Sequence, residues 1–176
     1  MASDGALVIW AEGNGPAGVE AQTRIQLAPA RRLAVWTAPP GPQELRVALD
    51  RVEPEEVIWF AQDSGLDEPS AFLQRLAGGI KHALRSRGGL VSLDEAAAAT
   101  AQRTSTVRAG IELLAARGQV VVVARGDVAW HLAPGGGEVD AEAAKHALNR
   151  LHALLEETVA YRAHVRHAPA TSLPVR

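Results

Sequence analysis

Apolar residues follow two different patterns in the first third of the chain. Three short runs, residues 6–10, 31–38 and 55–60, are dominated by apolar side chains, as in strands buried in a parallel sheet. Residues 43–52 instead carry leucines and valines at helical spacing, with Pro42 suited to the first turn. The order strand, strand, helix, strand predicts a small α/β, Rossmann-like sheet unit. Residues 23–28 alternate weakly and predict a further edge strand.

A second set of elements is predicted from residue 68 onward. Residues 68–89 have apolar side chains at helical spacing and end in a glycine pair. Ser92 is followed three residues later by Glu95, which is the pattern of a capping box at the start of a short helix over 92–101. Residues 68–101 therefore predict two successive helices.

The following residues predict a third helix and a hairpin. Thr104 or Ser105 is expected to cap this helix. Two apolar runs on either side of Gly126 predict antiparallel strands joined by a tight turn. Three helices followed by a hairpin is the order of a winged helix-turn-helix. The inward stripe of the third helix is expected to be Val107, Ile111, Leu114 and Ala115.

A long amphipathic helix is predicted over residues 140–168, with Asp140 as its cap. Its apolar seam is expected to comprise Ala144, Leu148, Leu151, Leu155 and Val159. We thus expect an α/β subdomain, a winged-helix subdomain, a C-terminal amphipathic helix and a tail, over residues 1–89, 90–135, 138–168 and 169–176.

Composition limits the classes of function. The chain of 176 residues has 20 acidic and 18 basic residues, so a nucleic-acid role would need a local basic patch. The absence of cysteine excludes disulfides and thiolate metal sites, and fits the reducing cytoplasm. No apolar run approaches the roughly 18 residues of a membrane span, and the N-terminal residues do not have the pattern of a secretory signal. We therefore expect a cytoplasmic protein without a membrane partner.

Catalytic motifs are absent from the sequence. The glycine-rich residues 13–18 lack the lysine of a phosphate-binding loop, and no nucleophile elbow occurs. Asp63, Asp67 and Glu68 could together hold a hard cation, but loop carboxylates of this kind more often cap turns and helices. His164 and His167 are spaced as a pair of metal ligands, without a third ligand nearby in sequence. We therefore expect no catalytic residue and no metal or other cofactor in this chain.

A modest basic signal surrounds the third predicted helix. Candidate nucleic-acid contacts are Arg103, Thr104, Thr106, Arg108, Arg117 and Arg125. Few of these side chains can read bases, so a scaffold or solvated face is favoured over direct contact with nucleic acid. Trp10, Trp36 and Trp59 lie at or near strand ends, where packing is favoured over base stacking.

Several segments together resemble the C-terminal region of RecJ-type single-strand-specific DNA exonucleases, which belong to the DHH phosphoesterase superfamily. The resemblance rests on "LAVWTAPPGPQELRVALDRVEPEEVIWF", on "FLQRLAGGIKHAL" and on "GIELLAARGQVVVVARGDVAWHL", with Tyr161 in the last helix. It covers residues 31–165 and depends on element order and short patterns. No "DHH" occurs, so no catalytic residue is carried over.

The resemblance implies a non-catalytic accessory module of a DNA-repair and recombination exonuclease. Such a module would handle single-stranded DNA or dock repair proteins or the parent nuclease core, and the parent would use divalent metal ions. Slight acidity and few aromatic residues favour docking. The alternative is a free-standing winged-helix transcriptional regulator with an α/β sensor domain, in which the long last helix forms a dimer seam.

Overall fold

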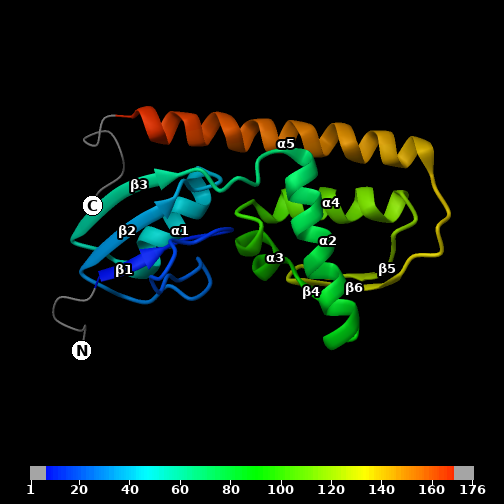
Figure 1. Cartoon of the computed structure of the whole chain (residues 1–176), viewed down its shortest axis with the longest axis horizontal. Helices are drawn as coiled ribbons and strands as arrows, with labels where there is room; N and C mark the ends of the chain where they lie inside the picture. Colours follow the sequence, from blue (N-terminus) through cyan, green and yellow to red (C-terminus); the bar gives the residue numbers. More distant parts are fainter. Residues whose placement is uncertain (1–6, 169–176) are drawn as a thin grey trace. The chain divides into compact units, whose positions relative to one another are not determined.

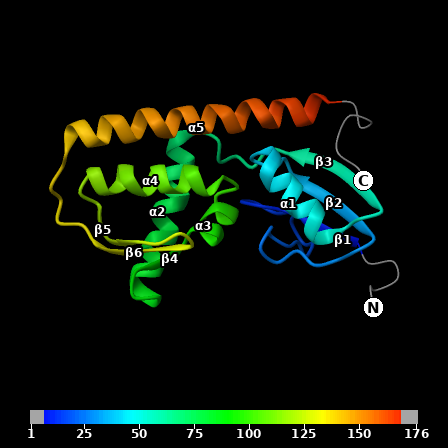
Figure 2. The same cartoon turned by 180° about the vertical axis from the view of Figure 1, so that it is seen from behind.

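The computed structural model describes residues 7–168, which form five helices and two small sheets (Figures 1 and 2). The expected α/β class is therefore confirmed. The chain divides into two compact units: unit 1 comprises Met1–Gly65 with Thr158–Arg176, and unit 2 comprises Leu66–Glu157. Among the described residues, no helix combines the length and apolar content needed to cross a membrane.

Unit 1 is built around a parallel three-stranded sheet in the order β1-β2-β3. The strands are β1 (Leu7–Trp10), β2 (Arg32–Thr37) and β3 (Glu56–Gln62), and α1 (Pro42–Val52) joins β2 to β3. All four elements lie where the sequence predicts them. The apolar core between α1 and the sheet contains Trp10, Leu33, Val35, Leu45, Ala48 and Val52.

The edge strand predicted over residues 23–28 is wrong, because Arg24, Ile25 and Gln26 form a turn. Gln26 accepts hydrogen bonds from the backbone N–H and the hydroxyl of Thr23, at 3.0 and 2.9 Å. Such local side-chain bonds compete with strand formation. The neighbouring Gln22 makes an isolated bridge to Trp10 of β1, so the pairing with the sheet does not extend into the predicted strand.

Unit 2 contains α2, α3, α4 and an antiparallel sheet in the order β4-β6-β5. Its elements in chain order are α2 (Pro69–Ser86), β4 (Leu90–Ser92), α3 (Leu93–Ala99), α4 (Thr104–Ala116), β5 (Val120–Arg125) and β6 (Ala129–Pro134), followed by the part of α5 (Ala141–His167) that ends at Glu157. The predicted helices and hairpin are confirmed. The strand β4 was not predicted, because its three residues are too few to show a period.

The helix caps of unit 2 agree with the sequence in one case and differ in another. Ser92 accepts a hydrogen bond from the backbone N–H of Glu95 at 3.3 Å, so this half of the predicted capping box is confirmed. Neither Thr104 nor Ser105 is the N-cap of α4, because both are already helical; Arg103 takes this position without a side-chain cap. The Arg103 carbonyl accepts the first helical bonds of α4.

The last helix, α5 (Ala141–His167), begins as predicted. Asp140 accepts a hydrogen bond from the backbone N–H of Ala143 at 3.0 Å. The predicted seam is wrong at its end, because Val159 is 44 % exposed whereas Thr158 is fully buried. A helical period continues from the buried Leu151 and Leu155 through 158, 162 and 165, which leaves position 159 at the flank of the buried face.

The two compact units divide the chain differently from the predicted subdomains, which remain a prediction. The predicted boundary follows residue 89, but the compact units separate after Gly65, so α2 belongs to unit 2. Phe72, Leu76 and Ile80 of α2 are buried in the unit 2 core, which explains this difference. The expected tail over residues 169–176 lies outside the described residues.

Candidate nucleic-acid interface

The helix α4, around which the predicted nucleic-acid contacts cluster in sequence, is largely enclosed. None of its thirteen residues is exposed. The seven buried residues are Thr106, Val107, Ala109, Gly110, Ile111, Leu113 and Leu114. Gly110 faces α2 so closely that an added Cβ would lie 2.6 Å from a methyl group of Leu76 and 2.8 Å from the ring of Phe72.

The N-terminal part of α5 runs antiparallel to α4, as polar contacts along both helices establish. Arg103 at the start of α4 donates to the carbonyl of Leu154 at 3.0 Å and to the carboxylate of Glu157 at 2.8 Å. Farther along α4, Glu112 pairs with Arg150 at 3.3 Å. These two helices lie side by side in both cartoon views (Figures 1 and 2).

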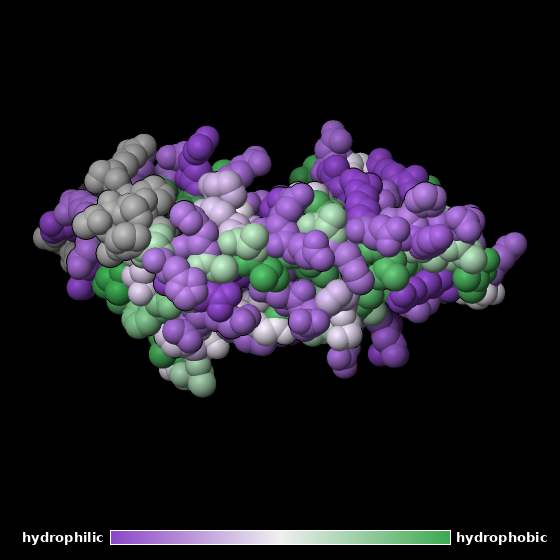
Figure 3. All heavy atoms as spheres, turned by 90° about the horizontal axis from the view of Figure 1, so that it is seen from above, coloured by the Kyte–Doolittle hydropathy of each residue, from purple (hydrophilic) through white to green (hydrophobic). Residues whose placement is uncertain are grey.

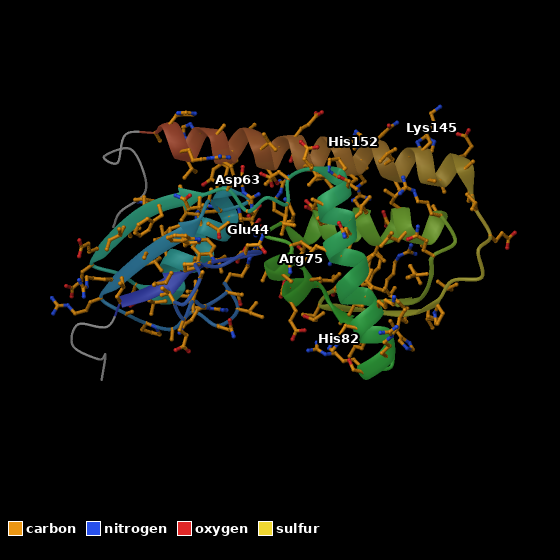
Figure 4. The ribbon with its side chains drawn as sticks, in the orientation of Figure 1. Glu44, Asp63, Arg75, His82, Lys145 and His152 are labelled. Atoms are coloured by element: carbon orange, nitrogen blue, oxygen red, sulfur yellow. The ribbon has the colours of Figure 1, made fainter. Side chains whose placement is uncertain are left out.

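Apolar packing joins the same two helices. Leu151 and Leu155 of α5 are 0 % and 2 % exposed and belong to the core cluster that contains Ile111 and Leu114 of α4. The outer side of α5 is polar, and Lys145 and His152 are exposed there (Figure 4). In the view toward α5, hydrophilic side chains predominate and apolar ones are scattered among them (Figure 3).

Of the six predicted contact residues, three are buried or hydrogen-bonded inside unit 2. Arg103 bonds to α5, as described above. Thr106 is fully buried, so its hydroxyl is closed to any outside ligand. Arg108 donates to the backbone carbonyl of Asp127 at 2.9 Å and so ties α4 to the β5–β6 turn.

The other three predicted residues lie at separate places. Thr104 is the first, half-buried residue of α4, and Arg117 is exposed at its C-cap. Arg125 is exposed at the end of β5, and its guanidinium lies 5.2 Å from the ring centre of Trp130. The six residues therefore do not form one outward surface on α4. The prediction that they contact nucleic acid remains a prediction.

Two open hollows border β5, α4 and the start of α5. The first, of about 800 Å³, is lined by Val120 and Val121 of β5 and by the acidic residues Glu138, Asp140 and Glu142. The second, of about 430 Å³, is lined by Arg125, Arg150 and His146, together with Glu112 and Asp140. Both hollows are lined by Ala115, Ala116 and Asp140, so they are neighbours.

A smaller hollow of about 160 Å³ lies between α2, β4 and α3. Its floor includes Leu76, Ile80 and Val91, and Arg75 and His82 project from α2 at its edge (Figure 4). The nearby Arg87 is paired with Glu95. The Ser86 hydroxyl lies 3.2 Å from Nε2 of His82, but it donates to the backbone carbonyl of His82 at 2.8 Å, so the imidazole does not activate it as a nucleophile.

Buried polar residues of unit 1, which were not predicted from the sequence, satisfy one another. Glu12 is 3 % exposed, pairs with Arg24 and accepts a hydrogen bond from the Trp10 indole at 3.0 Å. Arg162 is fully buried and donates to the carbonyl of Ala38 at 2.9 Å and to the hydroxyl of Ser64 at 3.0 Å. The helical period of α5 places position 162 on the buried side, and this signal could have identified Arg162. The charge of its side chain instead favours an exposed position, because arginine is rarely fully buried.

Two of the three carboxylates considered as cation ligands have side-chain partners in the protein, whereas Glu68 is the N-cap of α2 and makes no side-chain cap bond. Asp63 accepts a hydrogen bond from the backbone N–H of Gly65 at 2.8 Å and lies 3.7 Å from Arg166. Asp67 accepts one from Gln102 at 2.9 Å. Within residues 7–168, no group of three or more potential ligands is placed to hold a metal ion.

The pKa of Tyr161 departs clearly from the ordinary value of a tyrosine. Burial raises the pKa of its phenol, and the negative charge of Glu44 raises it further. One carboxylate oxygen of Glu44 is buried without a hydrogen-bond partner (Figure 4 labels Glu44). The arrangement keeps Tyr161 neutral and gives it no features of a catalytic acid or base near neutral pH.

In comparisons with known proteins, no family model, no curated protein and no solved structure matches the chain with statistical significance.

Proposed function

We propose that this chain is a non-catalytic accessory module that docks a partner protein, in the setting of DNA repair and recombination. The observation that carries the proposal is the enclosure of α4, none of whose residues is exposed. The repair setting rests on the resemblance to the C-terminal region of RecJ-type exonucleases. The partners it implies are the parent nuclease core or another repair protein.

We interpret unit 2 as a winged helix and unit 1 as a Rossmann-like sheet unit. The order α2, β4, α3, α4, β5, β6 and the antiparallel sheet support the first interpretation. In a winged helix that reads DNA, the helix in the position of α4 enters the major groove. Here α5 packs along that helix, so the fold serves as a scaffold rather than a reader of bases.

The alternative, a free-standing winged-helix regulator, needs an outward recognition helix and a self-complementary dimer seam. The apolar side of α5 that could form such a seam is used within unit 2, where Leu151 and Leu155 are buried. Gel filtration separates the two functions, because docking requires no dimer whereas the regulator predicts an obligate one.

A fluorescence-anisotropy titration with labelled single-stranded and duplex oligonucleotides, at low and physiological salt, tests the proposal. We expect no saturable binding to either DNA. Salt-sensitive binding would contradict the docking assignment. Loss of that binding in Arg108→Ala with Arg117→Ala, but not in the matched surface variant Arg31→Ala, would place the DNA on α4.

A further inference from the structure

The strand β5 is an open edge of the unit 2 sheet. Among the described residues it pairs with β6 alone. Val121 and Val123 are 49 % and 55 % exposed, and no charged side chain interrupts the strand before Arg125. Proteins usually protect such edges with charges, prolines or covering segments, because unpaired N–H and C=O groups accept another strand. Among the described residues of β5 before Arg125, the one irregularity that could hinder pairing at this edge is a register shift in the β5–β6 ladder between Val122 and Ala124.

The two hollows beside β5 differ in charge. The hollow at the start of the strand is lined by Glu138, Asp140 and Glu142. The hollow at its end contains Arg125, Arg150 and His146 together with Glu112 and Asp140, and Arg150 pairs with Glu112. The surroundings of the edge therefore change from acidic at the start of β5 to mixed charge at its end, where Arg125 is exposed.

We propose that the β5 edge binds an extended segment of a partner protein as a fourth, antiparallel strand. This inference rests on the proposed docking function and names its surface. Strand addition satisfies the free backbone groups, and side-chain pockets supply specificity. An antiparallel segment has its N-terminal end beside Arg125 and its C-terminal end beside Glu138. The segment is thus apolar in its centre, acidic at its N-terminal end and basic at its C-terminal end.

The probe is a labelled synthetic peptide of alternating valine and threonine, with two glutamates at its N-terminus and two lysines at its C-terminus. Binding to the full chain is followed by fluorescence anisotropy. We expect saturable binding that is weakened about tenfold or more by Val123→Lys, because a charge on the edge opposes pairing. Val128→Lys is the matched control, since Val128 is 68 % exposed outside β5, and it should bind as the unaltered chain does.

Charge reversal tests the proposed direction. A peptide with lysines at its N-terminus and glutamates at its C-terminus should bind more weakly to the unaltered chain. It should regain affinity in the variant with Glu138→Lys, Glu142→Lys and Arg125→Glu. Equal binding of both peptides to the unaltered chain would overturn the charge argument, and binding unaffected by Val123→Lys would overturn the strand argument.

If the β5 edge binds a second copy of the chain, or if the chain binds DNA or no ligand, the same measurements give different results. A second copy of the chain would appear as a concentration-dependent dimer that Val123→Lys abolishes, and this would overturn the peptide assignment. Absence of both peptide and DNA binding would overturn the β5 site and leave the proposed docking function standing. DNA binding to the same full chain would contradict the proposed function itself.

Discussion

The two small sheets differ in which residues are buried and which are exposed: polar residues are buried beside the sheet of unit 1, and apolar residues are exposed at the edge of the sheet of unit 2. At the carboxyl ends of the parallel strands β1–β3, where α/β folds commonly bind ligands, Glu12, Ser64 and Arg162 are buried and bonded within unit 1. The antiparallel sheet of unit 2 leaves the apolar edge strand β5 open. The comparison indicates that the polar cluster of unit 1 serves its stability, whereas the proposed docking surface lies on a mostly apolar edge.

The largest expected effect is on the buried ion pair of unit 1. Glu12→Ala leaves Arg24 and the Trp10 indole without their buried acceptor, and should lower the free energy of unfolding by about 3–5 kcal/mol. Glu55→Ala breaks the exposed pair with Arg31 and should cost less than about 1 kcal/mol. Urea unfolding measures both. Equal losses would show that the buried cluster is not structural.

A smaller effect is expected at the close contact between α4 and α2. Gly110→Ala adds a methyl group against Phe72 and Leu76, and should cost about 1–3 kcal/mol. Gly78→Ala, on the exposed side of α2 with nothing within 4 Å, should instead stabilise the chain by about 0.5–1 kcal/mol. Thermal unfolding of the two variants compares them. A neutral or stabilising Gly110→Ala would mean that α4 is not packed tightly on α2.

The smallest effect concerns alkaline pH. The folded-state pKa of Tyr161 lies above its ordinary value of 10.0, so the unfolded chain loses its proton first as pH rises. The stabilising contribution of Tyr161 is therefore complete below that value and is lost as pH rises through the folded pKa. Because the chain has a single tyrosine, absorbance titration of the phenolate reports this group alone. A titration midpoint at or below the ordinary value would contradict the assigned burial.

Local sequence patterns predicted most helices and strands because each carries its own period or cap. Ser92 and Asp140 accept the cap bonds expected of them. The strand β4 has three residues and no detectable period, and the turn near Gln26 depends on a local side-chain bond. Such features are decided by a few specific contacts, which periodicity does not contain.

The candidate site was harder to predict than the fold. Helical spacing alone does not show which side of α4 a second helix covers, so Thr106 was expected at a surface and is buried. The contacts of Arg103 with Leu154 and Glu157 join residues that lie 51 and 54 positions apart in sequence. The exposed valines of β5 were recognised as a strand, but their place at the sheet edge follows from the pairing order.

The most direct test of the central claim is thiol labelling of single introduced cysteines, because the chain has none of its own. Thr106→Cys reports on α4 and Val123→Cys on the β5 edge. We predict rapid modification at position 123 and modification at position 106 only as fast as unit 2 unfolds. Equally rapid modification at both positions would contradict the account, since α4 would then be open to an outside partner.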